Sequence, residues 1–267
     1  MIKLVAADMD GTLLDSQKQL PPDFWQTFDR LKAKGVLFVV ASGRTYPTLK
    51  RNFEPRAAEM TMICDNGGVI GVQNEPVYVS TIAPALRREL LEACEEIPDI
   101  HLAVSTPHTT YMLPYRQKPE EKRIIDLSFK DVKVVKDLYA IEDDVCQIAI
   151  CDIRHPDKNA YPVLSKKFAG RLAVQTSGSW WMDVMNAGVS KGSALTRLQK
   201  MLGVTAEETM AFGDFDNDIQ MLSVVGESYV MQNAPAHMFQ YGKHTAPSCD
   251  EYGVTQVIRR EILGDCI

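Results

Sequence analysis

Short apolar runs followed by amphipathic stretches open the chain. Residues 4–7 and 36–40 are uncharged and rich in aliphatic side chains, which is typical of strands that are covered on both faces. Residues 21–34 place apolar side chains at helical spacing and end at Gly35, and residues 46–52 continue as a shorter helical stretch. Two strand–helix units of this kind predict a parallel sheet that begins at the first strand.

The pattern changes character near residue 83. Residues 61–64 predict a third strand and residues 69–79 a hairpin, but helices and strands no longer alternate after them. Beyond residue 83 we expect two helices, 84–96 and 156–168, and a polar segment rich in Lys and Glu before residue 132. The strands expected in this part are 102–104, 110–112, 132–135, 147–151, 172–175 and 181–184. This mixture predicts an inserted α+β domain over residues 83–183.

Strands and helices alternate again after the insertion. We expect a helix over residues 190–201 and a strand over 209–212, followed by a short helix, a strand over 228–230 and a closing helix over 252–262. Because strands and helices alternate at both ends of the chain, we predict one sheet assembled from residues 1–82 and 184–267. The fold class is therefore α/β, with a Rossmann-like parallel-sheet core and an inserted α+β domain.

Composition places the chain among globular proteins with a sizeable core. It has 267 residues, of which 45% are hydrophobic and 24% charged, and a formal net charge of -6 without a Lys/Arg run. This charge argues against a nucleic-acid partner. Six cysteines without CxxC spacing favour neither a zinc site nor a disulfide framework. Without a basic leader or an apolar stretch of membrane-spanning length, we expect a cytoplasmic protein that has no membrane partner.

Two carboxylates close the first strand. Asp8 and Asp10 would lie on the same side of an extended strand, where neighbouring like charges need a cation or a shared proton. A bound divalent metal ion is the simplest way to offset the repulsion between these two carboxylates. The alternative is an exposed pair in which Asp10 and Gly11 serve only as turn residues.

Further polar residues follow other strand ends. Ser42 comes after the second strand, and its hydroxyl could bind a phosphate oxygen, with backbone N–H groups of the turn at Gly43 beside it. The alternative for Ser42 is a helix N-cap. Asp214, Asn217 and Asp218 form a second acidic group after the strand at 209–212.

Taken together, these residues resemble the four motifs of the haloacid dehalogenase superfamily. In chain order the motifs are Asp8-Met9-Asp10-Gly11-Thr12, Ser42, Lys191 and Gly213-Asp214-Phe215-Asp216-Asn217-Asp218. The inserted domain is similar to the cap of the Cof-like sugar-phosphatase branch, and the resemblance covers the whole chain. It implies a Mg²⁺-dependent phosphatase that hydrolyses a small phosphorylated metabolite, a sugar phosphate or a related phosphomonoester.

The resemblance also implies roles for the motif residues in catalysis. Asp8 would attack the phosphoryl group and carry a transient aspartyl-phosphate. Asp10 would protonate the leaving alkoxide and then activate water, which needs a carboxylic acid that its surroundings keep partly protonated. Lys191 would supply the counter-charge. A solvated lysine in a first helical turn is the alternative for Lys191, although a cation there opposes the helix dipole.

Binding roles follow from the same resemblance. Mg²⁺ would be held by Asp8, the backbone carbonyl of Asp10, Asp214 and Asp218, the last directly or through water. The phosphate would be held by Ser42, Gly43, Lys191 and Asn217.

Some alternatives stay open at this level. A phosphomutase would share these residues, and a non-enzymatic phospho-receiver also uses acidic residues with a Ser/Thr and a Lys but lacks a large insertion. Arg44 could orient its loop or touch substrate, and Asp216 is expected to be a helix cap or a loop residue. Asn66 and Gly67 match a loop near the site in the family, without an assigned role.

Overall fold

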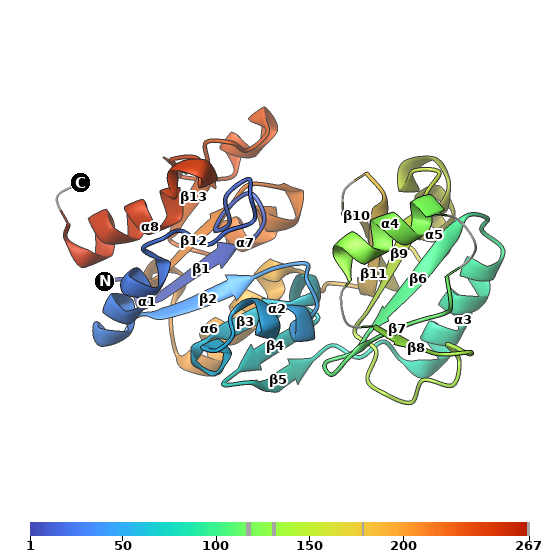
Figure 1. Ribbon diagram of the computed structural model, residues 1–267. Coiled ribbons are helices and arrows are strands. Elements are labelled where there is room, and N and C mark those ends of the chain that lie inside the picture. The colour runs from blue at the N-terminus through green and yellow to red at the C-terminus, as the bar shows by residue number, and fades with distance from the viewer. Residues whose placement is uncertain (116–118, 130–131, 178, 266–267) are drawn as a thin grey trace.

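The computed structural model describes residues 1–115, 119–129, 132–177 and 179–265. Within these residues the strands form one eight-stranded and one six-stranded sheet. The two sheets lie in separate lobes (Figure 1). We call the lobe built on the eight-stranded sheet the core lobe and the other the cap lobe. The predicted fold class, a parallel-sheet α/β core with an α+β cap, is confirmed.

The core sheet has the order β14-β13-β12-β1-β2-β3-β4-β5, and neighbours from β14 to β3 pair in parallel. Strands β4 and β5 add an antiparallel hairpin. Strands β1 and β2 point toward the cap lobe (Figure 1). The strands are β1 (Leu4–Asp8), β2 (Leu37–Ala41), β3 (Thr61–Cys64), β4 (Val69–Val72), β5 (Glu75–Val79), β12 (Thr209–Gly213), β13 (Glu227–Met231) and β14 (His244–Ala246).

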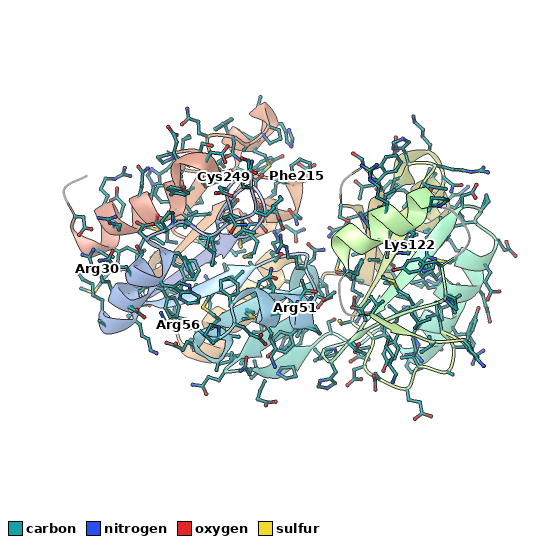
Figure 2. The ribbon with its side chains drawn as sticks, viewed as in Figure 1. Arg30, Arg51, Arg56, Lys122, Phe215 and Cys249 are labelled. Atoms are coloured by element: carbon teal, nitrogen blue, oxygen red, sulfur yellow. The ribbon has the colours of Figure 1, made fainter. Side chains whose placement is uncertain are left out.

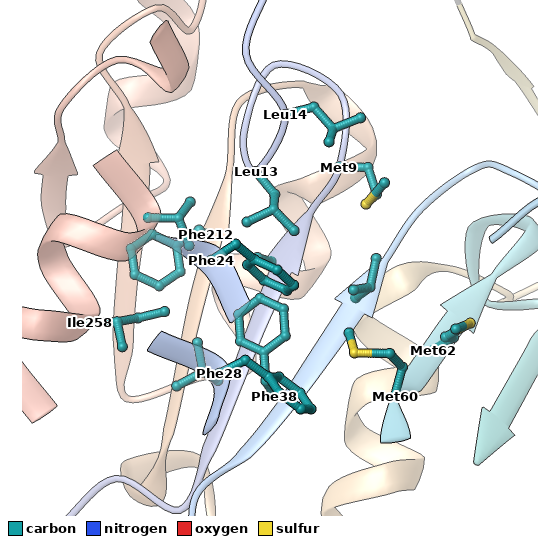
Figure 3. Close-up of a cluster of buried hydrophobic side chains, with 14 of the residues drawn as sticks. Met9, Leu13, Leu14, Phe24, Phe28, Phe38, Met60, Met62, Phe212 and Ile258 are labelled. Carbon is teal, nitrogen blue, oxygen red and sulfur yellow. The ribbon is translucent and has the colours of Figure 1, made fainter. Parts of the chain in front are cut away.

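Helices cover both faces of the core sheet because alternate residues of its strands are apolar on each side. Val5 and Ala7 of β1 belong to one buried cluster, whereas Leu4 and Ala6 belong to another. The first cluster includes Phe24 and Phe28 of α1 (Figure 3). Helices α1 (Phe24–Ala33), α2 (Tyr46–Asn52) and α8 (Gly253–Ile258) cover this face, and α6 (Lys191–Leu202) and α7 (Ile219–Ser223) cover the other.

The cap sheet has the order β10-β11-β9-β6-β7-β8 and is antiparallel except for the pair β7–β8. Helices α3 (Pro84–Glu95) and α5 (Ala160–Lys167) pack on one face, and α4 (Pro119–Ser128) packs on the other. The strands are β6 (Ile100–Ser105), β7 (Thr110–Met112), β8 (Val132–Val134), β9 (Gln147–Asp152), β10 (Leu172–Thr176) and β11 (Trp181–Asn186). In the described parts of the chain, no helix has both the length and the apolar character to cross a membrane.

The structure differs from the sequence-based expectation in several elements. The polar segment before residue 132 contains α4, in which charged residues outnumber apolar ones. Its Ile125 is nevertheless buried against the cap sheet. The helix expected over 156–168 divides into a 3-10 turn, Pro156–Lys158, and α5. Strand β14 was not predicted, because it is only three residues long and two of these are exposed.

The closing helix changes to a π-helix over Arg259–Leu263. Strand β11 continues to Asn186, so the cap sheet extends three residues past the expected return to the core at 183/184. The division of the chain into domains at 82/83 and 183/184 stays a prediction.

Candidate active site

Strand register brings the predicted site residues to one edge of the core sheet. Asp8 ends β1 and pairs with Ala41 of β2, so Ser42 follows directly on the neighbouring strand. On the other side, Ala7 pairs with Phe212 of β12, and Asp214 lies just beyond that strand. The carboxyl ends of parallel strands meet at the same edge, which in this fold class binds ligands.

Three carboxylates from distant parts of the sequence converge at this edge. Asp8, Asp214 and Asp218 each offer one oxygen atom, and these atoms lie within 4.8 Å of one another. Asp8 and Asp218 are buried, and Asp214 is half-buried. Such a group of negative charges, removed from water, needs positive charge close by.

Lys191 supplies one positive charge. Its side chain is fully buried, and Nζ donates to Oδ1 of Asp8 over 2.5 Å and to Oδ1 of Asp218 over 2.7 Å. The capping box of Ser190 and Ser193 starts α6 at this residue and so fixes where the lysine projects. The alternative of a solvated lysine is therefore wrong. Three ionised carboxylates and one ammonium leave two net negative charges, which a divalent cation would neutralise.

The site's ionisation follows from burial and mutual charge. Burial raises the pKa of Asp8, with Asp218 and Asp214 adding to the effect and Lys191 opposing it. Burial likewise raises the pKa of Asp214 to about 6, against a hydrogen bond from Thr12. Burial would lower the pKa of Lys191, but the carboxylates of Asp218 and Asp8 outweigh it and the pKa rises. The lysine therefore stays charged.

Local contacts hold the second acidic group in place. Oδ2 of Asp218 accepts hydrogen bonds from the backbone N–H groups of Asp214 and Phe215, at 3.0 and 3.2 Å. Thr12 Oγ1 donates to Oδ1 of Asp214 over 2.7 Å. Gly11 has φ 84°, and a Cβ there would lie 2.4 Å from Asp214 Oδ2, so the close approach requires glycine. Phe215 itself is 45% exposed on the core lobe (Figure 2).

Asp10 is held differently from the sequence-based expectation. Arg44 binds its carboxylate with Nε and Nη2, at 2.9 and 2.7 Å, and Lys18 Nζ lies 3.0 Å from Oδ1. Burial alone would raise the pKa of Asp10, but the hydrogen bonds and charges of Arg44 and Lys18 outweigh it and the net pKa falls below its ordinary value. The expectation that the surroundings keep Asp10 partly protonated is therefore wrong for this structure. Arg44 thus contacts Asp10 directly, and the two roles expected for Arg44, orientation of its loop and contact with substrate, stay predictions.

Apart from Lys191, which begins α6, the predicted phosphate-binding residues lie on two loops, one after β2 and one after β12. Ser42 is buried, and its Oγ accepts a hydrogen bond from the backbone N–H of Arg44 over 3.1 Å. Gly43 faces the carboxamide of Asn66. Nδ2 of Asn217 donates to Oδ1 of Asn66 over 3.1 Å. Asn66 is therefore joined to this group, although its sequence context suggested no role.

A signal for Asn66 was present in the sequence. It follows β3 and thus lies at the same sheet edge as Ser42, so the rule that selected Ser42 would also have selected it. Asp183, which Asn66 contacts across the lobes, gives no comparable signal within its strand. Asp216 lies in a 3-10 turn and contacts His237 Nε2 at 2.5 Å, in agreement with its expected place in a loop.

Together, the fold and this edge define the class of protein as a hydrolase with a parallel-sheet α/β core and an inserted cap. The chain belongs to the haloacid dehalogenase-like hydrolases, because the model of that family matches residues 5–258. This confirms the family expected from the motifs, including its Cof-like branch, and the enzyme class of phosphatase.

Relatives agree over nearly the whole chain. The 5-amino-6-(5-phospho-D-ribitylamino)uracil phosphatase YbjI of Escherichia coli is 28% identical over 258 residues, which are 96% of this chain and 95% of the relative. The HMP-PP phosphatase of Klebsiella pneumoniae is 27% identical over 241 residues, which are 88% of this chain and 85% of that phosphatase.

Solved structures give the same result. SMU.1108c from Streptococcus mutans has a TM-score of 0.87 at 26% identity, with 99% of this chain and 100% of that one covered. A haloacid dehalogenase-like hydrolase from Bacteroides thetaiotaomicron has a TM-score of 0.84 at 25% identity, with 97% and 99% covered. The arrangement of core and cap lobes is thus shared with known members of the family.

Proposed function

We propose that this protein hydrolyses a small phosphomonoester in a Mg²⁺-dependent reaction through an aspartyl-phosphate on Asp8. The observation that carries the proposal is the buried contact of Lys191 with both Asp8 and Asp218, beside Asp214. A phosphoryl group brings negative charge to a carboxylate nucleophile, so positive charge must already be in place. This edge of the sheet provides it from Lys191 and provides oxygen ligands for a divalent cation.

Each side chain of the site has a separate role in the proposed reaction. Asp8 attacks phosphorus, and the bond to the leaving alkoxide breaks as the aspartyl-phosphate forms. Asp10 gives a proton to the alkoxide, then takes one from the water that attacks the intermediate, which releases inorganic phosphate and restores Asp8. Ser42, Gly43 and Asn217 hold phosphate oxygens. Because Arg44 and Lys18 hold Asp10 as a carboxylate, Asp10 has to leave this pairing and take up a proton from solvent before it can donate one to the alkoxide.

A divalent cation fits the acidic group. Asp8, Asp214 and Asp218 offer carboxylate oxygens, the ligand type that Mg²⁺ prefers, and the backbone carbonyl of Asp10 is the proposed fourth protein ligand. When bound, Mg²⁺ supplies positive charge that reduces the repulsion between the phosphate and Asp8.

The proposed substrate is a small phosphorylated metabolite such as a sugar phosphate or a related phosphomonoester. Two relatives carry the names of phosphatases that act on a phosphorylated ribitylaminouracil and on HMP-PP. The cap lobe faces the carboxyl edge of the core sheet, so closure over the substrate would exclude water and favour small compounds.

Release of inorganic phosphate tests the proposal directly. Purified protein with Mg²⁺ is expected to release phosphate from members of a panel of phosphorylated sugars, nucleotides and cofactors, and chelation by EDTA should reduce the rate to background. A phosphomutase would instead require a bisphosphate activator and release little phosphate. Absence of release from every phosphomonoester in the panel would contradict the proposed function.

Metal binding is testable without turnover. A ligand that binds only the folded state raises its melting temperature, so Mg²⁺ should raise the Tm of the metal-free protein. Asp214→Asn should largely remove this shift. Asp216→Asn is the matched control, because Asp216 lies two residues away on the same loop, is exposed and stands outside the acidic group. An equal Mg²⁺ response in both variants would place the metal elsewhere.

A further inference from the structure

Consecutive side-chain hydrogen bonds link the core lobe to the cap lobe beside the site. Nδ2 of Asn217 donates to Oδ1 of Asn66 over 3.1 Å, and Nδ2 of Asn66 donates to Oδ2 of Asp183 over 3.0 Å. Asn217 and Asn66 belong to loops of the core lobe, whereas Asp183 lies on β11 of the cap sheet. The chain of contacts thus joins a proposed phosphate ligand to the second lobe.

The chemistry of Asp183 fixes the direction of every bond in this chain. An ionised carboxylate only accepts hydrogen bonds, so the NH₂ group of Asn66 must face it. Oδ1 of Asn66 then faces the opposite way and selects the NH₂ group of Asn217. One N–H of Asn217 is used in this contact, and the second remains able to donate to a phosphate oxygen. Reversal of Asn66 alone would set two NH₂ groups against each other. Reversal of Asn217 as well would remove this conflict but would turn the Asn217 carbonyl toward the phosphate.

The arrangement around Asp183 carries a cost in folding free energy, because it buries a carboxylate and two carboxamides. Asp183, Asn66 and Gln147 are almost fully buried, and Gln147 Nε2 donates to the second oxygen of Asp183 over 3.2 Å. Burial raises the pKa of Asp183 to about 6, although hydrogen bonds from Ser177 and Asn66 lower it. A carboxylate at this position therefore carries a desolvation cost that a neutral residue would avoid.

The backbone of Asn66 is fixed by the phosphate-binding loop itself. Its N–H donates to the carbonyl of Ser42 over 3.1 Å, and its φ of 52° lies in the left-handed region that Asn tolerates. A Cβ on Gly43 would lie 3.2 Å from the Asn66 carboxamide, so the glycine allows the two loops to pack closely. The core lobe thus holds the backbone of Asn66, while Asp183 of the cap lobe determines the orientation of its carboxamide.

We propose that Asn66 is a positioning residue through which Asp183 of the cap lobe orients the Asn217 carboxamide for phosphate binding. The inference rests on the proposed function, in which Asn217 binds phosphate. It makes full affinity for phosphate dependent on the docked position of the cap lobe, because the acceptor that sets the orientation belongs to that lobe.

The test measures phosphate affinity in the full-length protein with Mg²⁺. Inorganic phosphate serves as a competitive inhibitor of p-nitrophenyl phosphate hydrolysis, and KM and kcat are recorded separately. Asn217→Ala, Asn66→Ala and Asp183→Ala are each expected to weaken phosphate inhibition about tenfold. The double variant Asp183→Ala/Asn217→Ala should be no weaker than Asn217→Ala alone, since both changes remove the same contact. Additive losses, about a hundredfold together, would overturn the proposal.

A conservative variant separates orientation from structure. Asp183→Asn retains one acceptor for Asn66, and its NH₂ group replaces the oxygen that accepts from Gln147 Nε2. Reversal of the Gln147 carboxamide then presents Oε1, which has no hydrogen-bond partner within the described residues, to this NH₂ group. This variant is therefore expected to keep phosphate affinity within about twofold of the wild type. A loss equal to that of Asp183→Ala would contradict the orientation argument.

Controls cover folding and the proposed function. Asp152→Ala removes another buried carboxylate of the cap sheet, whose hydrogen-bond donors among the described residues all lie in the cap lobe. This variant should leave phosphate inhibition unchanged. If Asp183→Ala fails to fold, Asn66→Ala in the same cycle with Asn217→Ala tests the link from the core lobe. An Asn217→Ala variant with normal phosphate inhibition would instead refute the proposed role of Asn217, independently of the coupling.

Discussion

Asp8→Asn is expected to reduce phosphate release by at least about 10³-fold, because a carboxamide is a far weaker nucleophile than a carboxylate. The side chains are nearly the same size, so packing at the end of β1 should persist. Burial already raises the pKa of Asp8, and a neutral amide removes an unfavourable buried charge. The variant should therefore melt no lower than the metal-free wild-type protein. Initial rates and thermal unfolding measure the two effects.

Asp29→Asn is the matched control for this change. Asp29 is an exposed carboxylate on α1 that pairs with Arg56, so the same substitution should leave turnover unchanged. Retention of substantial activity by Asp8→Asn would remove Asp8 from its role as nucleophile. Mass spectrometry of the wild-type protein adds a second readout, since a long-lived phosphoryl group on Asp8 without turnover would favour a phospho-receiver.

Lys191→Met should lower both activity and stability. Methionine fills a similar volume without charge, which leaves Asp8 and Asp218 buried and without their shared cation. Breaking a buried ion pair from one side costs about 3–5 kcal/mol of unfolding free energy. Loss of the positive charge beside the nucleophile should lower kcat about 10²–10³-fold. Urea unfolding of the metal-free protein and steady-state kinetics with Mg²⁺ provide the measurements.

The stability loss of Lys191→Met should depend on pH in a defined direction. Without the lysine, burial and the neighbouring carboxylates hold the pKa of Asp8 further above its value in the unfolded chain. Groups with raised pKa values favour the folded state at low pH, and this stability is lost as the pH rises through their folded-state values. The deficit should therefore grow from mildly acidic to mildly alkaline buffer. A deficit that shrinks over this range would contradict the assignment.

Lys200→Met tests whether these effects are specific. Lys200 is exposed in the last turn of the same helix, α6, so the same substitution should change unfolding free energy by less than about 0.5 kcal/mol. A comparable loss of stability in both variants would indicate that α6 tolerates no such change, rather than that Lys191 pairs with buried carboxylates.

Features that depend on neighbouring residues were readable in the sequence. The apolar runs that form β1 and β2 end in Asp8 and Ala41, and the Ser190 cap with Gly203 at the other end bounds α6. Hydrophobic periodicity and capping act over a few residues, so they predict elements and order the motifs. Helix α4 was missed because the few apolar side chains that anchor it are outnumbered by charged ones.

Contacts between distant residues were decided only by the tertiary structure. Nothing in the spacing of Asp10 and Arg44 shows that the guanidinium binds the carboxylate and lowers its pKa, because the shift depends on which charges folding brings within a few ångströms. The link from Asn66 to Asp183 joins residues 117 positions apart on two lobes. The sequence by itself determined the order of most strands along the chain and the chemical groups at their ends, because both depend on nearby residues. Folding determined which of those groups share a cation or a hydrogen bond, because that depends on contacts between distant residues.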